Sequence, residues 1–409
     1  MTATRRVLLG LFVVGLGLSI TLSETALALL TLHWIWQLRE AEIRVEARWP
    51  LWQPVVAFTA VSLISALASE DPGAAVAACK GLLLVAALYV TANALPGPGA
   101  ALRFLSGLLI VAAVAAAAGI VQTTACPGSA TDYGAPAWLY HRCYRARGFF
   151  SIYMTLAGVT SLVLLANLPR LLPGPASWRW LSLPWLVTLG GLVATYTRGA
   201  WLGSSVGALA LLPSMRKGRW LLLAGLVMLG LAMLAGPPHL RQRLLTMGDP
   251  DDPTAKERVY MWRSGLAMWR GHALLGVGPG GVKRGYEAYA LPEAVKKRTG
   301  HLHNTPLQIL VERGVVGLLA WLWIWGQFYA RSITVLRRLT DLADIERAVV
   351  AGSVAAITGF LVAGLFEYNF GDSEVVMVAW CLTAMPFTVG LTDRGRRLLG
   401  DRSDRLDQN

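Results

Sequence analysis

Long apolar runs follow one another through most of this 409-residue chain, and they constrain its fold more than any other feature. Helical runs of about twenty residues match the hydrocarbon thickness of a bilayer. Only 15% of the residues are charged, whereas an ordinary soluble domain carries about a quarter. The sequence therefore predicts an all-α, multi-spanning membrane protein and argues against a soluble globular domain.

Twelve apolar segments are candidate membrane spans, an even number that puts both chain ends on one side. They lie at about 7–22, 24–37, 54–70, 73–92, 101–121, 151–168, 181–197, 199–213, 219–236, 306–330, 347–368 and 374–392. Lys and Arg gather in alternate loops and in the tail, whereas the intervening turns are short and acidic. Because cytoplasmic loops carry the excess of Lys and Arg, we expect both termini in the cytoplasm.

These spans divide the chain into four expected parts. They are an N-terminal transmembrane bundle (1–236), a large outward loop (237–305), C-terminal transmembrane helices (306–393) and a cytoplasmic tail (394–409). The outward loop holds eleven Lys and Arg against six Asp and Glu. A basic outer face suits an anionic substrate, although a solvated surface or contact with anionic lipid head groups would use the same charges.

A helix is expected inside the outward loop. Asp252, followed by proline, is typical of a helix start. Val259, Trp262, Leu266 and Trp269 then recur at helical spacing, which predicts an amphipathic helix lying on the membrane or the bundle. The acidic run 249–252 fits helix capping better than any metal-binding motif.

The four cysteines divide into two pairs. Cys126 and Cys143 share a predicted outward loop, where an oxidising compartment permits a disulfide, so we expect one. Cys79 and Cys381 lie in apolar runs and are interpreted as small buried hydrophobes.

A short polar stretch joins the outward loop to the next apolar run. Thr305 is the expected N-cap and Pro306 suits the first helical turn. His303 and Asn304 would then lie just outside a helix N-terminus at the membrane boundary. The positive end of the helix dipole disfavours imidazolium, so a histidine there tends to stay neutral and able to take a proton.

The spacing of this stretch resembles the signature of the O-antigen ligase and polymerase superfamily. The matching residues are His303, Asn304, Leu307, Glu312, Gly314 and Gly317. The resemblance implies that His303 contacts the acceptor hydroxyl, with His301 as an alternative two residues upstream. Gly314 and Gly317 are expected to leave a smooth face for close packing of another helix.

Four arginines extend the resemblance. Arg198 is similar to the superfamily's arginine at the end of a central span, and Arg258, in Arg-x-x-x-Trp, to the arginine heading its outer-loop helix. Arg147, followed by glycine, resembles a further element, with Arg145 as an alternative register. Guanidinium groups bind phosphate oxygens through paired hydrogen bonds, so these arginines are candidates for holding a diphosphate.

The function implied by the resemblance is O-antigen ligation. A glycan would move from undecaprenyl diphosphate to a sugar hydroxyl of lipid A–core at the periplasmic face of the inner membrane. O-antigen polymerase shares the motif, while protein O-oligosaccharyltransferase and a lipid-linked glycan transporter are two further candidates. Since arginines would carry the diphosphate charge, we expect a metal-independent glycosyltransferase. In-line attack at the anomeric carbon would make it an inverting one, and we expect no cofactor and no nucleic-acid partner.

Overall fold

The computed structural model describes residues 3–124, 145–172, 176–215, 218–249, 251–339 and 345–389, and every regular element in these ranges is a helix. Five of the described helical stretches are long and apolar enough to cross a membrane. Shorter apolar helices cover 52–67, 219–235 and 373–389. The all-α membrane class is confirmed, while the number of twelve spans and their orientation stay predictions.

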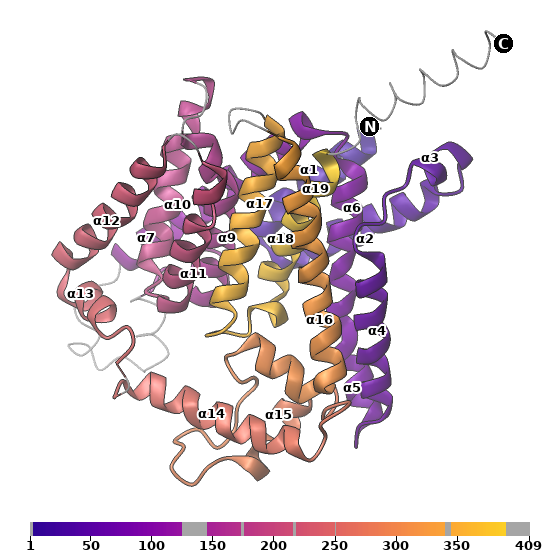
Figure 1. The fold of residues 1–409 in the computed structure, drawn as a ribbon, viewed down its shortest axis with the longest axis vertical. Helices are drawn as coiled ribbons and strands as arrows, with labels where there is room; N and C mark the ends of the chain where they lie inside the picture. The colour runs from indigo at the N-terminus through magenta and orange to yellow at the C-terminus, as the bar shows by residue number, and fades with distance from the viewer. Residues whose placement is uncertain are drawn as a thin grey trace.

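The helices form one bundle, and two of them lie across one end of it. Figure 1 shows α14 and α15 lying across one end of the bundle, whereas the N-terminus is marked at the other. The helices up to residue 124 are α1 (Ala3–Leu18), α2 (Ile20–Gln37), α3 (Ala41–Glu46), α4 (Trp52–Leu67), α5 (Pro72–Ala78), η1 (Cys79–Val85), α6 (Ala86–Ala94) and α7 (Pro98–Thr124). Those from 153 to 249 are α9 (Tyr153–Leu171), η2 (Ala176–Leu181), α10 (Ser182–Ala194), α11 (Arg198–Leu209), η3 (Leu212–Ser214), α12 (Arg219–Ala235) and α13 (Pro238–Leu245). The remainder are α14 (Pro253–Arg270), α15 (Gly281–Gly285), η4 (Tyr286–Tyr289), α16 (Thr305–Arg338), α17 (Ile345–Ala363), η5 (Asn369–Gly371), α18 (Ser373–Thr383) and α19 (Met385–Val389).

Helices α9, α11 and α17 pack closely through small residues. A Cβ on Gly352 of α17 would collide with the Ala166 carbonyl of α9, and one on Gly207 of α11 would collide with the backbone of α17. Such close approach is the usual basis of helix packing in a bilayer, where burial against lipid gives no hydrophobic gain. This tightly packed unit carries Arg198 at the start of α11 and Glu367 in the loop after α17.

Helix α14 is present as predicted, and Trp262 and Trp269 of its apolar stripe pack against a buried cluster. Its buried residues include Met261 and Met268, which pack in one cluster with Leu302. Val259 and Leu266, the other two residues of the predicted stripe, are both 38% exposed. Val282, Tyr286 and Leu302 complete the cluster against α14, while contact of the exposed part of the stripe with a membrane stays a prediction.

Gly314 interrupts α16 with a φ of 66°, in the left-handed region that glycine adopts most readily. The turn segment 273–277 packs against this break, and the Val315 N–H donates to the Ala273 carbonyl at 2.9 Å. A Cβ on Gly314 would collide with that segment. The expected partner of Gly314 and Gly317 was a helix, and at Gly314 it is loop backbone instead.

The cysteine predictions have different outcomes. Cys79 and Cys381 are buried and free, as expected. Cys126 and Cys143, the predicted disulfide pair, lie outside the described residues.

Candidate active site

The loop 299–304 leads into α16, and its last residue caps the helix. The Leu307 N–H donates to Asn304 Oδ1 at 2.9 Å, so Asn304 is the N-cap. The prediction of Thr305 as cap was wrong because its hydroxyl donates to the Glu367 carbonyl at 2.9 Å instead. Asparagine satisfies the free N–H groups at a helix start at least as well as threonine. The loop after α17 is thereby tied to the start of α16.

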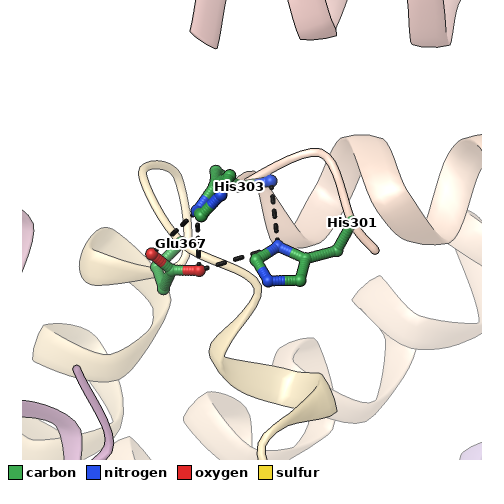
Figure 2. A group of neighbouring side chains, drawn as sticks. All are labelled: His301, His303 and Glu367. Atoms are coloured by element: carbon green, nitrogen blue, oxygen red, sulfur yellow. Dashed lines mark hydrogen bonds and ion pairs between the residues drawn. The ribbon is translucent and has the colours of Figure 1, made fainter. Parts of the chain in front are cut away.

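His303, directly before the cap, has a φ of 49°, which is uncommon for a residue other than glycine. Its ring points toward Glu367, and Figure 2 shows His301 and His303 both facing that carboxylate. His303 Nδ1 lies 2.9 Å and 3.0 Å from the two Glu367 oxygens. An ionised carboxylate only accepts hydrogen bonds, so in the neutral form of His303 Nδ1 carries the proton and Nε2 has the lone pair.

His301 lies beside this pair in a different role. The His303 backbone N–H donates to His301 Nδ1 at 3.4 Å, and that Nδ1 is 3.7 Å from Glu367 Oε1. The two imidazole centroids are 4.2 Å apart, and the Tyr368 ring is 5.8 Å from His301. When neutral, His301 therefore carries its proton on Nε2, and its Nδ1 lone pair is already used.

A buried chain of hydrogen bonds holds the backbone between the histidines. The Leu302 N–H donates to Gln308 Oε1 at 2.8 Å, and Gln308 Nε2 donates to Glu312 Oε1 at 2.9 Å. Arg313 in turn donates to Glu312 Oε2 at 3.1 Å and to Ser62 Oγ at 2.9 Å. The motif residue Glu312 thus lies away from the histidine rings and supports the loop that carries them.

The Glu367 carboxylate lies within 4 Å of Arg258 as well as of the two histidines. Arg258, in the second turn of α14, has its guanidinium 3.8 Å from this carboxylate. Burial by itself raises the pKa of Glu367, but the hydrogen bond from His303, the charges that His303 and His301 carry at the acidic pH where a carboxyl titrates, and the charge of Arg258 outweigh it, so the pKa lies below its ordinary value. Burial lowers the pKa of His301, against the opposing effect of Glu367. At neutral pH an ionised carboxylate therefore faces a neutral His301.

Arg198 is held by the start of α14 and by the residue after α13. Its guanidinium donates to Asp252 Oδ1 at 3.0 Å and Oδ2 at 3.2 Å, and to the Thr246 carbonyl at 2.9 Å. Asp252 also caps α14, as predicted, by accepting from the N–H groups of Thr254 and Ala255. Arg198 and Asp252 form a two-point ion pair whose side chains are only 16% and 13% exposed.

Arg145, before α9, joins the same region. Its guanidinium lies 4.1 Å from the centroid of the Tyr153 ring. Burial lowers the pKa of Arg145, and the positive charges of Arg243 and Arg198 act in the same direction. Arg147 is half-buried nearby in the sequence, but the described contacts include none between it and Arg198. We call Arg145, Arg198 and Arg258 the arginine cluster, and their mutual repulsion favours binding of an anion.

Two cavities are lined by residues next in sequence to site residues. An apolar cavity of about 400 Å³ is lined by Leu244 and Met247, which lie on either side of Thr246 in the sequence. A larger cavity of about 920 Å³ has Gln308 and Tyr368 in its walls. Neither lining includes His301, His303, Glu367 or a residue of the arginine cluster, so both cavities are connected to the site only through neighbouring residues of the chain.

His301, His303 and Glu367 also offer a donor set for a metal ion, since one ligand atom of each lies within 4.8 Å of the others. Two histidines and a carboxylate suit a transition metal. The positive charge of Arg258, 3.8 Å from the carboxylate, opposes a bound cation. Sequence spacing did not indicate this group because Glu367 and His303 are 64 residues apart.

Sequence reasoning missed the partners of His303 and Arg198. A charge at the end of an apolar run is costly, so the position of Glu367 was a usable signal, but nothing in the sequence paired it with His303. Asp252 was assigned to capping alone, and nothing in the sequence around Thr246 indicated a contact with Arg198.

The fold and the site define a helical membrane protein in which a histidine–carboxylate pair faces clustered arginines. Residues 183–322, about a third of the chain, match the family model described as O-Antigen ligase. The resemblance to the O-antigen ligase and polymerase superfamily is thereby confirmed over this stretch, which contains Arg198, Arg258 and His303. No curated protein matches the chain.

Proposed function

We propose that this protein is an O-antigen ligase. It transfers a glycan from undecaprenyl diphosphate to a sugar hydroxyl of lipid A–core at the periplasmic face of the bacterial inner membrane. The observation that carries the proposal is the contact of His303 with Glu367, next to Arg258. A base and a set of cations in one place are what transfer from a diphosphate-linked donor needs.

His303 is the general base in this proposal. Its Nε2 accepts the proton of the acceptor hydroxyl while the hydroxyl oxygen attacks the anomeric carbon of the donor. Glu367, hydrogen-bonded to Nδ1, holds the ring in place and stabilises the imidazolium that forms. His301 lacks a free lone pair when its Nδ1 accepts from the His303 backbone, which favours His303 as the base.

The arginine cluster binds the leaving group. The bond between the anomeric carbon and the phosphate oxygen breaks, and its electron pair goes to the diphosphate. Guanidinium groups stabilise that growing charge through paired hydrogen bonds. A single displacement inverts the anomeric carbon. The cavity of about 400 Å³ beside Thr246 gives the lipid part of the donor an apolar environment.

The sidedness of the site belongs to the same proposal. With both termini in the cytoplasm, α14 faces the periplasm, as the excess of arginine in alternate loops favours. A single cysteine replacing Thr254, which is exposed at the start of α14, tests this. Labelling by a membrane-impermeant maleimide in intact spheroplasts supports the proposal, and labelling only after permeabilisation contradicts it.

Complementation tests the reaction itself. The chain should restore long-chain lipopolysaccharide in a ligase-null strain and should not extend lipid-linked repeats in a polymerase-null strain. The opposite pattern would assign polymerase activity, which shares the motif. Uptake of lipid-linked glycan into vesicles without a covalent product would assign transport.

A further inference from the structure

Asp252 occupies the face of Arg198 that a diphosphate would need. Both carboxylate oxygens of Asp252 accept from the guanidinium, at 3.0 Å and 3.2 Å. Carboxylate and phosphate bind guanidinium in the same way, through two parallel hydrogen bonds. The two anions therefore compete for one set of donors.

Asp252 would keep other hydrogen-bond partners if its ion pair with Arg198 were broken. Its Oδ1 also accepts from the N–H groups of Thr254 and Ala255, at 2.9 Å and 3.0 Å. These bonds, at the positive end of α14, continue to stabilise the carboxylate when Arg198 is withdrawn. Arg198 keeps its bond to the Thr246 carbonyl, at 2.9 Å, so it stays oriented during an exchange.

The surrounding charge favours exchange for a dianion over a monoanion. Asp252 neutralises one guanidinium, while Arg145 and Arg258 lie near enough to influence Arg198 electrostatically. A diphosphate carries enough negative charge to interact with all three.

We propose that Asp252 is an internal substitute for the donor diphosphate: it holds Arg198 in the donor-free protein, gives it up when the diphosphate binds, and takes it back as the lipid diphosphate product leaves. This inference rests on the proposed function, because it assumes that Arg198 binds the diphosphate. Asp252 is thus a specificity-determining residue, which lowers affinity for the product and for anions that cannot displace it.

Asp252→Asn tests the exchange with the full-length protein in detergent and undecaprenyl diphosphate as the probe. Asparagine caps a helix as well as aspartate does, so α14 should keep its start. Removing the competing Asp252 carboxylate should tighten binding of undecaprenyl diphosphate about tenfold, since a charge-assisted hydrogen bond is stronger than a neutral one. In transfer assays the donor KM should fall while kcat does not rise, because the product leaves more slowly.

Asp251→Asn is the matched control. It removes the same charge one residue away, but the Asp251 side chain is 82% exposed and pairs with Lys256, so its effect on affinity should stay within about twofold. Asp252→Ser, which also caps helices, repeats the test if the asparagine variant unfolds.

Arg198→Ala distinguishes a failure of the exchange from a failure of the proposed function. It should weaken binding of undecaprenyl diphosphate, and adding Asp252→Asn to it should then give no gain in affinity. If Arg198→Ala weakens binding but Asp252→Asn behaves like Asp251→Asn, the exchange is wrong and the proposed function stands. If Arg198→Ala binds the probe normally, the proposed role of Arg198 is wrong as well.

Discussion

Glu367→Gln should separate the positioning of His303 from the binding of the donor. The substitution keeps the size of the side chain but removes the negative charge that accepts from His303 Nδ1 at 2.9 Å and 3.0 Å. The imidazolium formed during proton transfer then loses its partner. His303 also loses the interaction that fixes which ring nitrogen carries the proton.

The size of the effect follows from the lost interaction. A hydrogen bond to a charged group contributes about 1.5–3 kcal/mol. Because about 1.4 kcal/mol is a factor of ten in rate, kcat should fall about 10- to 100-fold. Donor affinity should change much less, since Glu367 pairs with Arg258 only at 3.8 Å and does not touch Arg198.

The assay is product formation by purified protein with donor and acceptor lipids, read on a gel, together with titration of the donor. Glu287→Gln is the control, because Glu287 is 56% exposed and pairs with Arg298. Full turnover of Glu367→Gln, or an equal loss in the control, would refute the role assigned to Glu367.

Three further predictions follow from the site. Arg198→Lys should restore only part of the donor affinity lost in Arg198→Ala, because an ammonium cannot make the two-point contact; equal affinity of Lys and wild type would contradict this. Transfer should survive EDTA, and a loss restored by Zn²⁺ or Mn²⁺ would instead identify His301, His303 and Glu367 as metal ligands. The lowered pKa of Glu367 should stabilise the fold at pH values above the ordinary carboxyl pKa of about 4.3 and lose this contribution as pH falls through the lowered value. The Tm difference between wild type and Glu367→Gln should therefore persist at pH 5 and shrink below about pH 4.3, whereas a difference independent of pH would contradict the assignment.

The sequence was sufficient to find the elements that carry the site. Apolar runs located the helices, and polar residues at their ends indicated which side chains would lie at one boundary. His303, Arg198 and Arg258 all lie in such positions, and the structure brings them to the same end of the bundle. That much follows from the cost of placing charge inside a bilayer.

Contacts between distant segments could not be predicted in the same way. The bond between His303 and Glu367 spans 64 residues, and no local pattern encodes it. The break at Gly314 depends on segment 273–277, which supplies backbone partners for an interrupted helix. The residues that cover α14 could not be predicted either, since periodicity describes an apolar stripe but not which neighbour covers it.

The most direct test compares His303→Ala with His301→Ala in the purified system. A general base contributes about 10²- to 10⁴-fold in rate, so His303→Ala should lose transfer to that extent. Donor affinity should be nearly unchanged, because the diphosphate is bound by the arginine cluster. His301→Ala, which removes the side chain without a free lone pair, should retain more activity. Full turnover by His303→Ala, with transfer lost in His301→Ala, would contradict the assignment of His303 as the base.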